Sequence, residues 1–138
     1  RQQRTKGEKI KSVPRTKIMV MDDEEIVRDV SQAMLCQLGH EVVTAQHGEE
    51  AVRLYGEALH STAPIELTIM DLTIPGGMGG KEAVQELLKM NKKAKVLVSS
   101  GYSNDPIIAN YRKFGFCGTI VKPYRFNELE RVLGEMLG

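Results

Sequence analysis

The sequence predicts an α/β protein in which five parallel strands form one doubly wound sheet with helices on both faces. Five short apolar runs alternate with longer segments whose apolar residues recur every three or four positions. Within the short runs consecutive residues are apolar, as expected for strands buried on both faces. Strands that alternate with helices are joined by right-handed crossovers, so the sheet should be parallel.

The first half of the chain contains three of these strands and two helices. The strands are expected at residues 18–21, 42–45 and 67–70. An amphipathic helix should run from Ile26 to Leu38 and end at Gly39, because apolar residues follow helical spacing and glycine favours a helix end. The apolar positions of this first helix are Ile26, Val27, Val30, Ala33, Met34 and Leu38. A second helix is expected over residues 51–59.

The second half begins with a glycine-rich loop, residues 75–80, before a helix over residues 83–88. Residues 96–98 and 119–121 are the fourth and fifth strands, and residues 126–136 form the last helix. Between those two strands, Asp105 and Pro106 are a favourable helix start, and the apolar pattern continues that helix to Phe114.

Composition narrows the class of protein. The chain has 138 residues, of which 41% are apolar and 27% charged, and its formal net charge is +1. These values fit one globular domain and give no indication of nucleic-acid binding. Cys36 and Cys117 lack metal-ligand spacing, and we expect both to be partly buried, reduced thiols.

The first fifteen residues differ from the rest because they carry six basic side chains and one acidic one. We expect residues 1–15 to be a basic linker or disordered lead-in, and residues 16–138 to be the folded domain. The non-Met start suggests a segment of a longer protein. No apolar run approaches the roughly 20 residues that span a bilayer, and no signal peptide is recognisable, so a cytoplasmic location without direct membrane contact is expected.

Polar residues gather where the predicted strands end. The first strand leads into Asp22 and Asp23, the third into Asp71 and the fifth into Lys122, and Ser99 and Ser100 follow the fourth. Ligands of doubly wound sheets bind at this edge, near the reversal in strand order. Three close carboxylates repel one another unless a cation is present, and Mg²⁺ prefers such oxygen ligands. Alone, each residue would be read as a helix cap or a turn former.

Together these motifs make the sequence similar to response-regulator receiver domains over residues 17–137. The resemblance rests on Asp22 and Asp23, on Asp71 with Pro75 four residues later, on Ser100 with Gly101, and on Lys122 with Pro123. It implies a flavodoxin-like fold with strand order 2-1-3-4-5. It also implies a phosphorelay function in which a histidine kinase or a histidine-phosphotransfer protein exchanges a phosphoryl group with Asp71.

The resemblance also assigns roles to single residues. Asp71 is the expected phosphoacceptor, and Asp22, Asp23, Asp71 and the Thr73 backbone carbonyl are the expected Mg²⁺ ligands. Ser100 and Lys122 are expected to contact the phosphoryl group. Ser99 remains a competing candidate for the hydroxyl. The bond between Lys122 and Pro123 is commonly cis in this family.

Two departures from the family pattern affect signalling. Thr119 stands where a switching aromatic residue is common, which leaves Tyr102 or Tyr124 to share that task. The glycine-rich loop is one residue longer than the commonest form, and glycine makes it easy to bend. The expected output face comprises helix four, strand five and helix five, with Tyr111, Thr119, Tyr124 and Phe126 as candidates for the readout.

Several functions are compatible with this sequence pattern. The motif around Asp71, together with residues 98–103, resembles the terminal receivers of hybrid sensor histidine kinases, although a stand-alone regulator is possible. As a domain alone it would be a phosphoacceptor rather than a turnover enzyme. A haloacid-dehalogenase-type phosphatase would require an acid/base Asp at position 73, where this chain has Thr73. The same fold could also serve as a flavodoxin-like cofactor module or as a phosphate-independent docking domain. The oligomeric state is left open.

Overall fold

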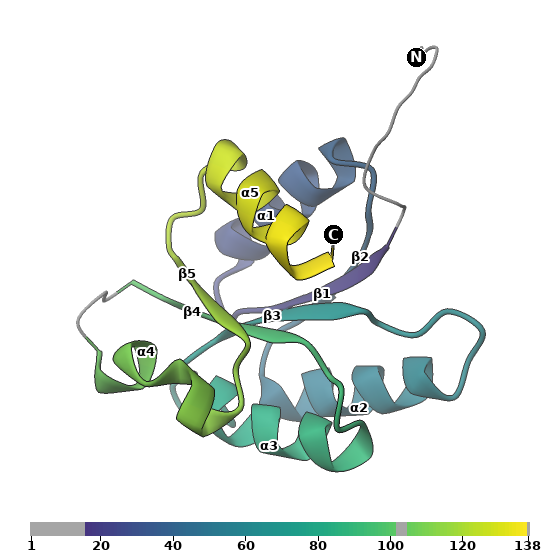
Figure 1. The fold of residues 1–138 in the computed structure, drawn as a ribbon, viewed down its shortest axis with the longest axis vertical. Helices are drawn as coiled ribbons and strands as arrows, with labels where there is room; N and C mark the ends of the chain where they lie inside the picture. The colour runs from purple at the N-terminus through teal and green to yellow at the C-terminus, as the bar shows by residue number, and fades with distance from the viewer. Residues whose placement is uncertain (1–15, 102–104, 138) are drawn as a thin grey trace.

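The computed structural model describes residues 16–101 and 105–137 as a sheet between two layers of helices (Figure 1). The five strands are all parallel and lie in the order β2-β1-β3-β4-β5, which confirms the predicted doubly wound fold. The expected basic lead-in and Tyr102 lie outside the described residues.

The strands are short, and the three central ones are almost entirely buried. They are β1 (Lys17–Met21), β2 (Glu41–Ala45), β3 (Leu67–Asp71), β4 (Val96–Ser100) and β5 (Gly118–Val121). Every residue of β3 and β4 is buried, as expected for central strands covered on both faces. Both strands extend beyond the predicted apolar runs, so Asp71, Ser99 and Ser100 are themselves strand residues.

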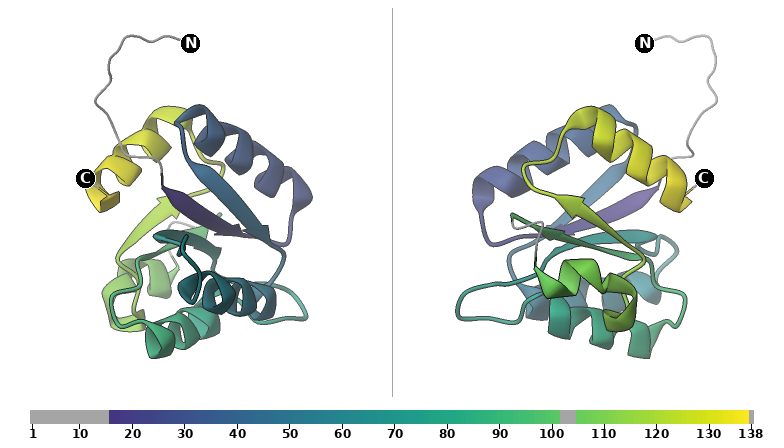
Figure 2. Two further views of the ribbon diagram at one scale, coloured as in Figure 1. Left: turned by 90° about the vertical axis from the view of Figure 1, so that its right-hand side faces the viewer. Right: turned by 60° about the vertical axis from the view of Figure 1, so that its left-hand side comes forward.

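Two helices cover one face of the sheet, and the remaining helices cover the other (Figures 1 and 2). On the first face are α1 (Glu25–Gln37) and α5 (Phe126–Leu137), and on the second are α2 (Gly48–Leu59), α3 (Gly80–Met90), α4 (Pro106–Ala109) and the 3₁₀ helix η1 (Tyr111–Phe114). Within the described residues, no helix combines the length and apolar character needed to cross a bilayer.

Side chains of alternate strand residues form two separate cores, because successive side chains of a strand point to opposite faces. Ile18, Val20, Leu67, Ile69 and Leu97 pack toward α1 and α5 with Leu129 and Leu133. Met19, Met21, Met70, Val96 and Val98 pack toward α2 and α3 with Ala51, Val84 and Leu87. The same alternation determines to which face of the sheet the site residues at the strand ends point.

The predicted fourth helix is only partly correct. The Asp105 carboxylate caps its start by accepting a 2.8 Å hydrogen bond from the Ile107 N–H, as its sequence position predicts. The α-helix nevertheless ends after one turn at Asn110, whose side-chain amide donates to the Pro106 carbonyl at 2.9 Å. The chain continues as η1 and stops at Gly115, which has a left-handed φ of 99°. Asn110 therefore divides what the apolar pattern predicted as one helix.

The predicted buried face of the first helix is correct only in part. Val27, Met34 and Leu38 pack against the core. Ile26 is 76% exposed and Val30 is 47% exposed, whereas Ser31 and Leu35 are fully buried. Cys36 is likewise exposed, contrary to the expectation of a partly buried thiol, because it lies on the outer side of this helix. Cys117 is half-buried as expected, and both cysteines are free. The helix thus presents apolar side chains beside the carboxyl end of β1.

Candidate functional site

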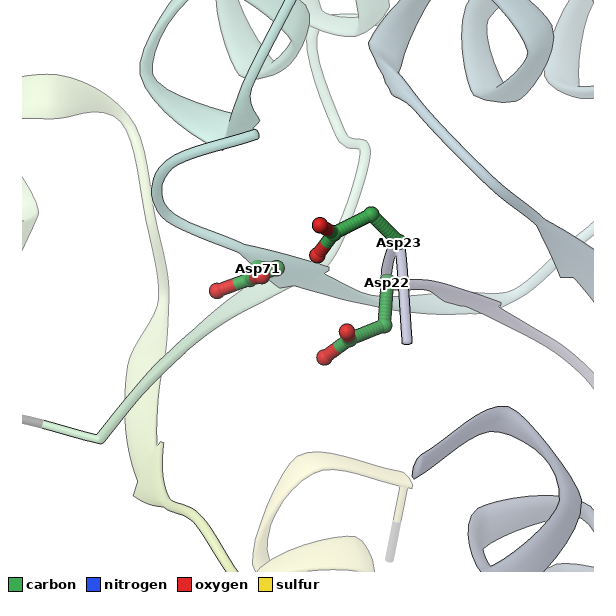
Figure 3. A group of neighbouring side chains, drawn as sticks. All are labelled: Asp22, Asp23 and Asp71. Carbon is green, nitrogen blue, oxygen red and sulfur yellow. The ribbon is translucent and has the colours of Figure 1, made fainter. Parts of the chain in front are cut away.

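Three carboxylates meet at the carboxyl edge of the sheet. Asp22 and Asp23 directly follow β1, and Asp71 ends the neighbouring strand β3. One carboxylate oxygen from each of the three lies within 4.8 Å of the others. Figure 3 shows the three side chains reaching into the same space from these two strands. The structure therefore brings together the three acidic residues that the sequence singled out.

Backbone and side-chain contacts hold Asp22 in place. Its N–H continues the pairing of β1 with β2 by donating to the Ala45 carbonyl at 3.0 Å. Its carboxylate accepts a 2.9 Å hydrogen bond from the Glu24 N–H, and its carbonyl accepts one of 2.8 Å from Arg28 Nη1. Asp22 is fully buried, so these contacts fix a carboxylate that solvent does not reach.

Lys122 brings a positive charge to this cluster from the end of β5. Its Nζ lies 2.9 Å from Asp22 Oδ2 and 3.4 Å from Asp71 Oδ2, and a third carboxylate, Glu24 Oε1, is 3.9 Å away. The backbone N–H of Lys122 also donates to the Ser100 carbonyl at 3.0 Å, which ties the chain after β5 to β4. The peptide bond between Lys122 and Pro123 is cis, as the family resemblance implied.

The charges perturb one another's protonation. Burial and the neighbouring Asp22 charge raise the pKa of Asp71 to about 6, and the opposing effect of Lys122 offsets only part of this. Partial burial lowers the pKa of Lys122, but its hydrogen bond to Asp22 and the charge of Asp71 outweigh that effect and raise it. The site thus concentrates more negative charge than one lysine neutralises.

An open cleft of about 640 Å³ gives access to Asp71. Its lining includes Asp23, Thr73, Ser100 and Lys122 together with Asp71. Ser99 is not part of that lining and is fully buried. The geometry therefore favours Ser100 over Ser99 as the hydroxyl that can meet a ligand in the cleft.

The glycine-rich loop is packed closely against the backbone of the site. A Cβ on Gly80 would lie 2.7 Å from the Asp71 carbonyl oxygen, and one on Gly79 would lie 2.5 Å from that of Leu72. The Gly80 N–H donates to the Leu72 carbonyl at 3.1 Å. These two glycines are required because α3 starts against the residues that carry the site.

Sequence reasoning missed two residues that belong to the site. Glu24 lines the cleft near Lys122, and Arg28 supports the Asp22 carbonyl from one turn further along α1. The run of acidic residues from Asp22 to Glu25 could have indicated Glu24. The contact made by Arg28 depends on a side-chain direction that sequence spacing does not give. Thr119 is half-buried within β5, in register with Val98.

The donor set fits a small hard cation. Three carboxylates with close oxygens, next to Thr73 in the lining of the cleft, offer the oxygen ligands that Mg²⁺ prefers in proteins. A divalent cation would also relieve the repulsion from Asp22, which together with burial raises the pKa of Asp71. The residues present thus match the metal that the sequence predicted.

Known proteins share this sequence pattern. The family model for the response regulator receiver domain matches residues 18–133. Chemotaxis protein CheY of Thermotoga maritima is 27% identical over 121 residues, covering 87% of this chain and 96% of CheY. The autoinducer 1 sensor kinase/phosphatase LuxN of Vibrio campbellii is 31% identical over 120 residues, covering 87% of this chain and 13% of LuxN. The chain thus spans nearly all of one relative and a small part of the other.

A solved structure agrees with the fold. The response regulator TrrA of Thermotoga maritima, determined in complex with Mg²⁺ and BeF, superposes with a TM-score of 0.76 at 29% identity, covering 88% of this chain and 99% of TrrA. The matched family model, the 2-1-3-4-5 parallel sheet and the acidic cleft at its carboxyl edge agree with one another. The chain belongs to the response regulator receiver domain family of two-component signalling proteins.

Proposed function

We propose that this domain accepts a phosphoryl group from a phosphohistidine onto the carboxylate of Asp71. The observation that carries the proposal is the position of Asp71 at the floor of an open cleft, between two further carboxylates and the ammonium of Lys122. In the transfer, an Asp71 oxygen forms a bond to phosphorus while the bond from phosphorus to the imidazole nitrogen breaks. The electron pair of the broken bond returns to the ring nitrogen, which takes up a proton from solvent, so the products are an acyl phosphate and a free imidazole.

Asp22, Asp23, Asp71 and the Thr73 carbonyl would hold Mg²⁺ at this site. When bound, the ion supplies positive charge that neutralises the phosphoryl oxygens, which is the main requirement of phosphoryl transfer apart from positioning. The closeness of three carboxylate oxygens and the raised pKa of Asp71 support this assignment.

Lys122 and Ser100 would provide the remaining contacts to the phosphoryl group. Lys122 lies at a distance of 3.4 Å from Asp71 and can exchange this contact for one to a phosphoryl oxygen. Ser100 lines the same cleft from the end of β4. Movement of these two residues toward the added charge would shift the domain between two conformations, which is how the signal leaves the site.

The phosphodonor is proposed to be a histidine kinase or a histidine-phosphotransfer protein. Ile26 and Val30 lie four residues apart on α1, so they form one exposed apolar strip. Val27 on the same helix lines the cleft, which makes the strip continuous with the mouth of the site. An apolar helix surface on the donor could bury this strip while presenting its phosphohistidine to Asp71. No contact with nucleic acid or membrane is part of this proposal.

The similarity to a part of the sensor kinase/phosphatase LuxN supports a place within a hybrid sensor histidine kinase. A cytoplasmic location is part of the proposal. A stand-alone regulator is the alternative. The similarity to CheY supports it, because the match covers 87% of this chain and 96% of CheY. A turnover phosphatase is disfavoured because Thr73, which lines the cleft, offers no acid/base carboxylate.

Intact-mass measurement after incubation with acetyl phosphate and Mg²⁺ tests the proposal. The wild type should gain the mass of one phosphoryl group, and Asp71→Asn should gain none. Equal labelling of both proteins would overturn the assignment, and continuous release of phosphate from a simple phosphate ester would favour the phosphatase.

A further inference from the structure

Two buried hydroxyl groups lie beneath the acidic cluster, on Ser99 and Tyr124. Ser99 pairs with Asp71 in the register of β3 and β4, so both side chains point to the α1 and α5 face of the sheet. Tyr124 belongs to the core on that same face, together with Ile69 and Leu97, which precede Asp71 and Ser99 by two residues. The two hydroxyls are therefore on the cluster's own side of the sheet.

Neither hydroxyl makes a hydrogen bond of good geometry within the described part of the chain. Ser99 is fully buried and Tyr124 is 8% exposed, and the two hydroxyls interact only weakly with each other. Burying an unpaired hydroxyl is unfavourable, and alanine or phenylalanine would fill these positions without that cost. Most buried polar groups in proteins are hydrogen-bonded, so two neighbouring hydroxyls without a good hydrogen bond beneath one site call for a common explanation.

The electrostatic surroundings connect this pair to the cluster. Burial raises the pKa of Tyr124, a weak hydrogen bond with the Ser99 hydroxyl partly opposes that rise, and the negative charges of Asp22 and Asp71 add to it. The phenol consequently stays neutral, with its O–H dipole in the field of the two carboxylates. A phosphoryl group on Asp71 would carry about −1.5 to −2 charges in place of the single charge of the carboxylate, which strengthens that field.

We infer that Ser99 and Tyr124 are positioning residues that transmit the charge state of Asp71 to the start of α5. Added negative charge on Asp71 turns the two hydroxyls toward the site and brings them into hydrogen-bonding geometry. Tyr124 lies two residues before Phe126, the first residue of α5, so a shift of its ring moves the segment that leads into this helix. The inference rests on the proposed role of Asp71 and goes beyond it by naming the route of the signal.

This route is distinct from one through Thr119. Thr119 is in register with Val98, whose side chain belongs to the core on the α2 and α3 face. Thr119 and Tyr124 therefore lie on opposite faces of the sheet. A domain with threonine at that position of β5 can still report the phosphoryl group through the α5 face.

The variants Tyr124→Phe and Ser99→Ala test this inference, because each removes one hydroxyl and leaves the packing nearly intact. Tyr55→Phe is the matched control: Tyr55 is 3% exposed and lies on α2, across the sheet, where its oxygen accepts a 3.0 Å hydrogen bond from Asn91. Binding of beryllofluoride with Mg²⁺, a stable substitute for the phosphoryl group, is measured together with hydrogen exchange at the start of α5.

In the wild type, beryllofluoride should slow hydrogen exchange in the first turn of α5. Tyr124→Phe and Ser99→Ala should each weaken beryllofluoride binding about two- to tenfold, the value of one hydrogen bond, and should lose most of the slowing. Exchange without ligand should stay as in the wild type, which a purely structural defect would not allow. Tyr55→Phe should retain both the affinity and the slowing.

Wild-type affinity and wild-type slowing in both variants would overturn the inference while leaving the role of Asp71 intact. The same loss in Tyr55→Phe would also overturn it, because the effect would then be general. Absence of beryllofluoride binding by the wild type would instead overturn the proposed function, and this inference with it.

Discussion

Lys122 donates a 2.9 Å hydrogen bond to the buried carboxylate of Asp22, a residue one hundred positions earlier in the chain. Its contact with Asp71 is longer, at 3.4 Å. Lys122 is therefore held chiefly by a residue that is not the proposed acceptor, and its charge offsets a cluster of three carboxylates. We therefore expect the stability of the domain to depend on cations.

Replacing Lys122 should reveal this dependence. Lys122→Met leaves Asp22 buried without its charged partner, so the free energy of unfolding in EDTA should fall by about 1–3 kcal/mol. Mg²⁺ should restore part of the loss by binding the same carboxylates. Urea unfolding with and without Mg²⁺ measures both effects. Lys89→Met, which breaks only an exposed pair with Glu86, should change stability by less than about 1 kcal/mol. A Lys122 variant as stable as the wild type in EDTA would contradict this account.

Asp71 should make the domain less stable as pH rises. Its folded-state pKa of about 6 lies above the ordinary value of 3.8, so the folded state holds this proton more tightly than the unfolded state does. The stabilisation is complete below about pH 4 and is lost as pH rises through about 6. In EDTA, Asp71→Asn should lack this dependence and be more stable than the wild type at pH 7. Urea unfolding from pH 4 to pH 8 checks the prediction, and a wild type at least as stable as Asp71→Asn at pH 7 would refute it.

The exposed strip on α1 should matter for a protein donor and not for a small one. Ile26→Glu removes a 76% exposed apolar side chain beside the cleft, and transfer from a phosphorylated histidine kinase should slow by about tenfold or more. Labelling by acetyl phosphate should be unchanged. Met90→Glu is the control, because Met90 is also an exposed apolar residue but lies at the end of α3. Equal slowing in both variants, or slowing with acetyl phosphate, would argue against a docking role for the strip.

Gly79 should tolerate no side chain. A Cβ there would lie 2.5 Å from the Leu72 carbonyl oxygen, so Gly79→Ala should lower the free energy of unfolding by about 1–3 kcal/mol and impair labelling of Asp71. Gly134→Ala in α5 has no atom within 4 Å of the new Cβ and should be neutral or slightly stabilising. Chemical unfolding and acetyl phosphate labelling of the two variants test the difference. An undisturbed Gly79→Ala protein would show that the loop adapts without affecting the site.

The sequence allowed the sheet and the acidic cluster to be predicted because both depend on short-range regularities. Apolar runs indicated the strands, and the carboxyl ends of parallel strands meet at one edge, so Asp22, Asp23 and Asp71 had to approach one another. The cleft also includes Ser100 and Lys122 as expected, since they lie at the carboxyl ends of the neighbouring strands β4 and β5.

Features decided by tertiary contacts were not predictable in this way. Asn110 ends α4 by bonding its side chain to a carbonyl one turn earlier, although the apolar pattern continues past it. The exposure of Ile26 and Val30 depends on how α1 lies on the sheet, which helical spacing alone does not determine. Arg28 and the unpaired hydroxyls of Ser99 and Tyr124 become visible only with side-chain positions.

Chemical trapping of the phosphorylated residue tests the central claim most directly. The wild type is phosphorylated with acetyl phosphate and Mg²⁺ and reduced with borohydride, which converts an aspartyl phosphate to homoserine, and the peptides are then sequenced by mass spectrometry. The proposed function predicts homoserine at position 71 and unmodified aspartate at positions 22 and 23. Homoserine at another position, with Asp71 intact, would contradict it.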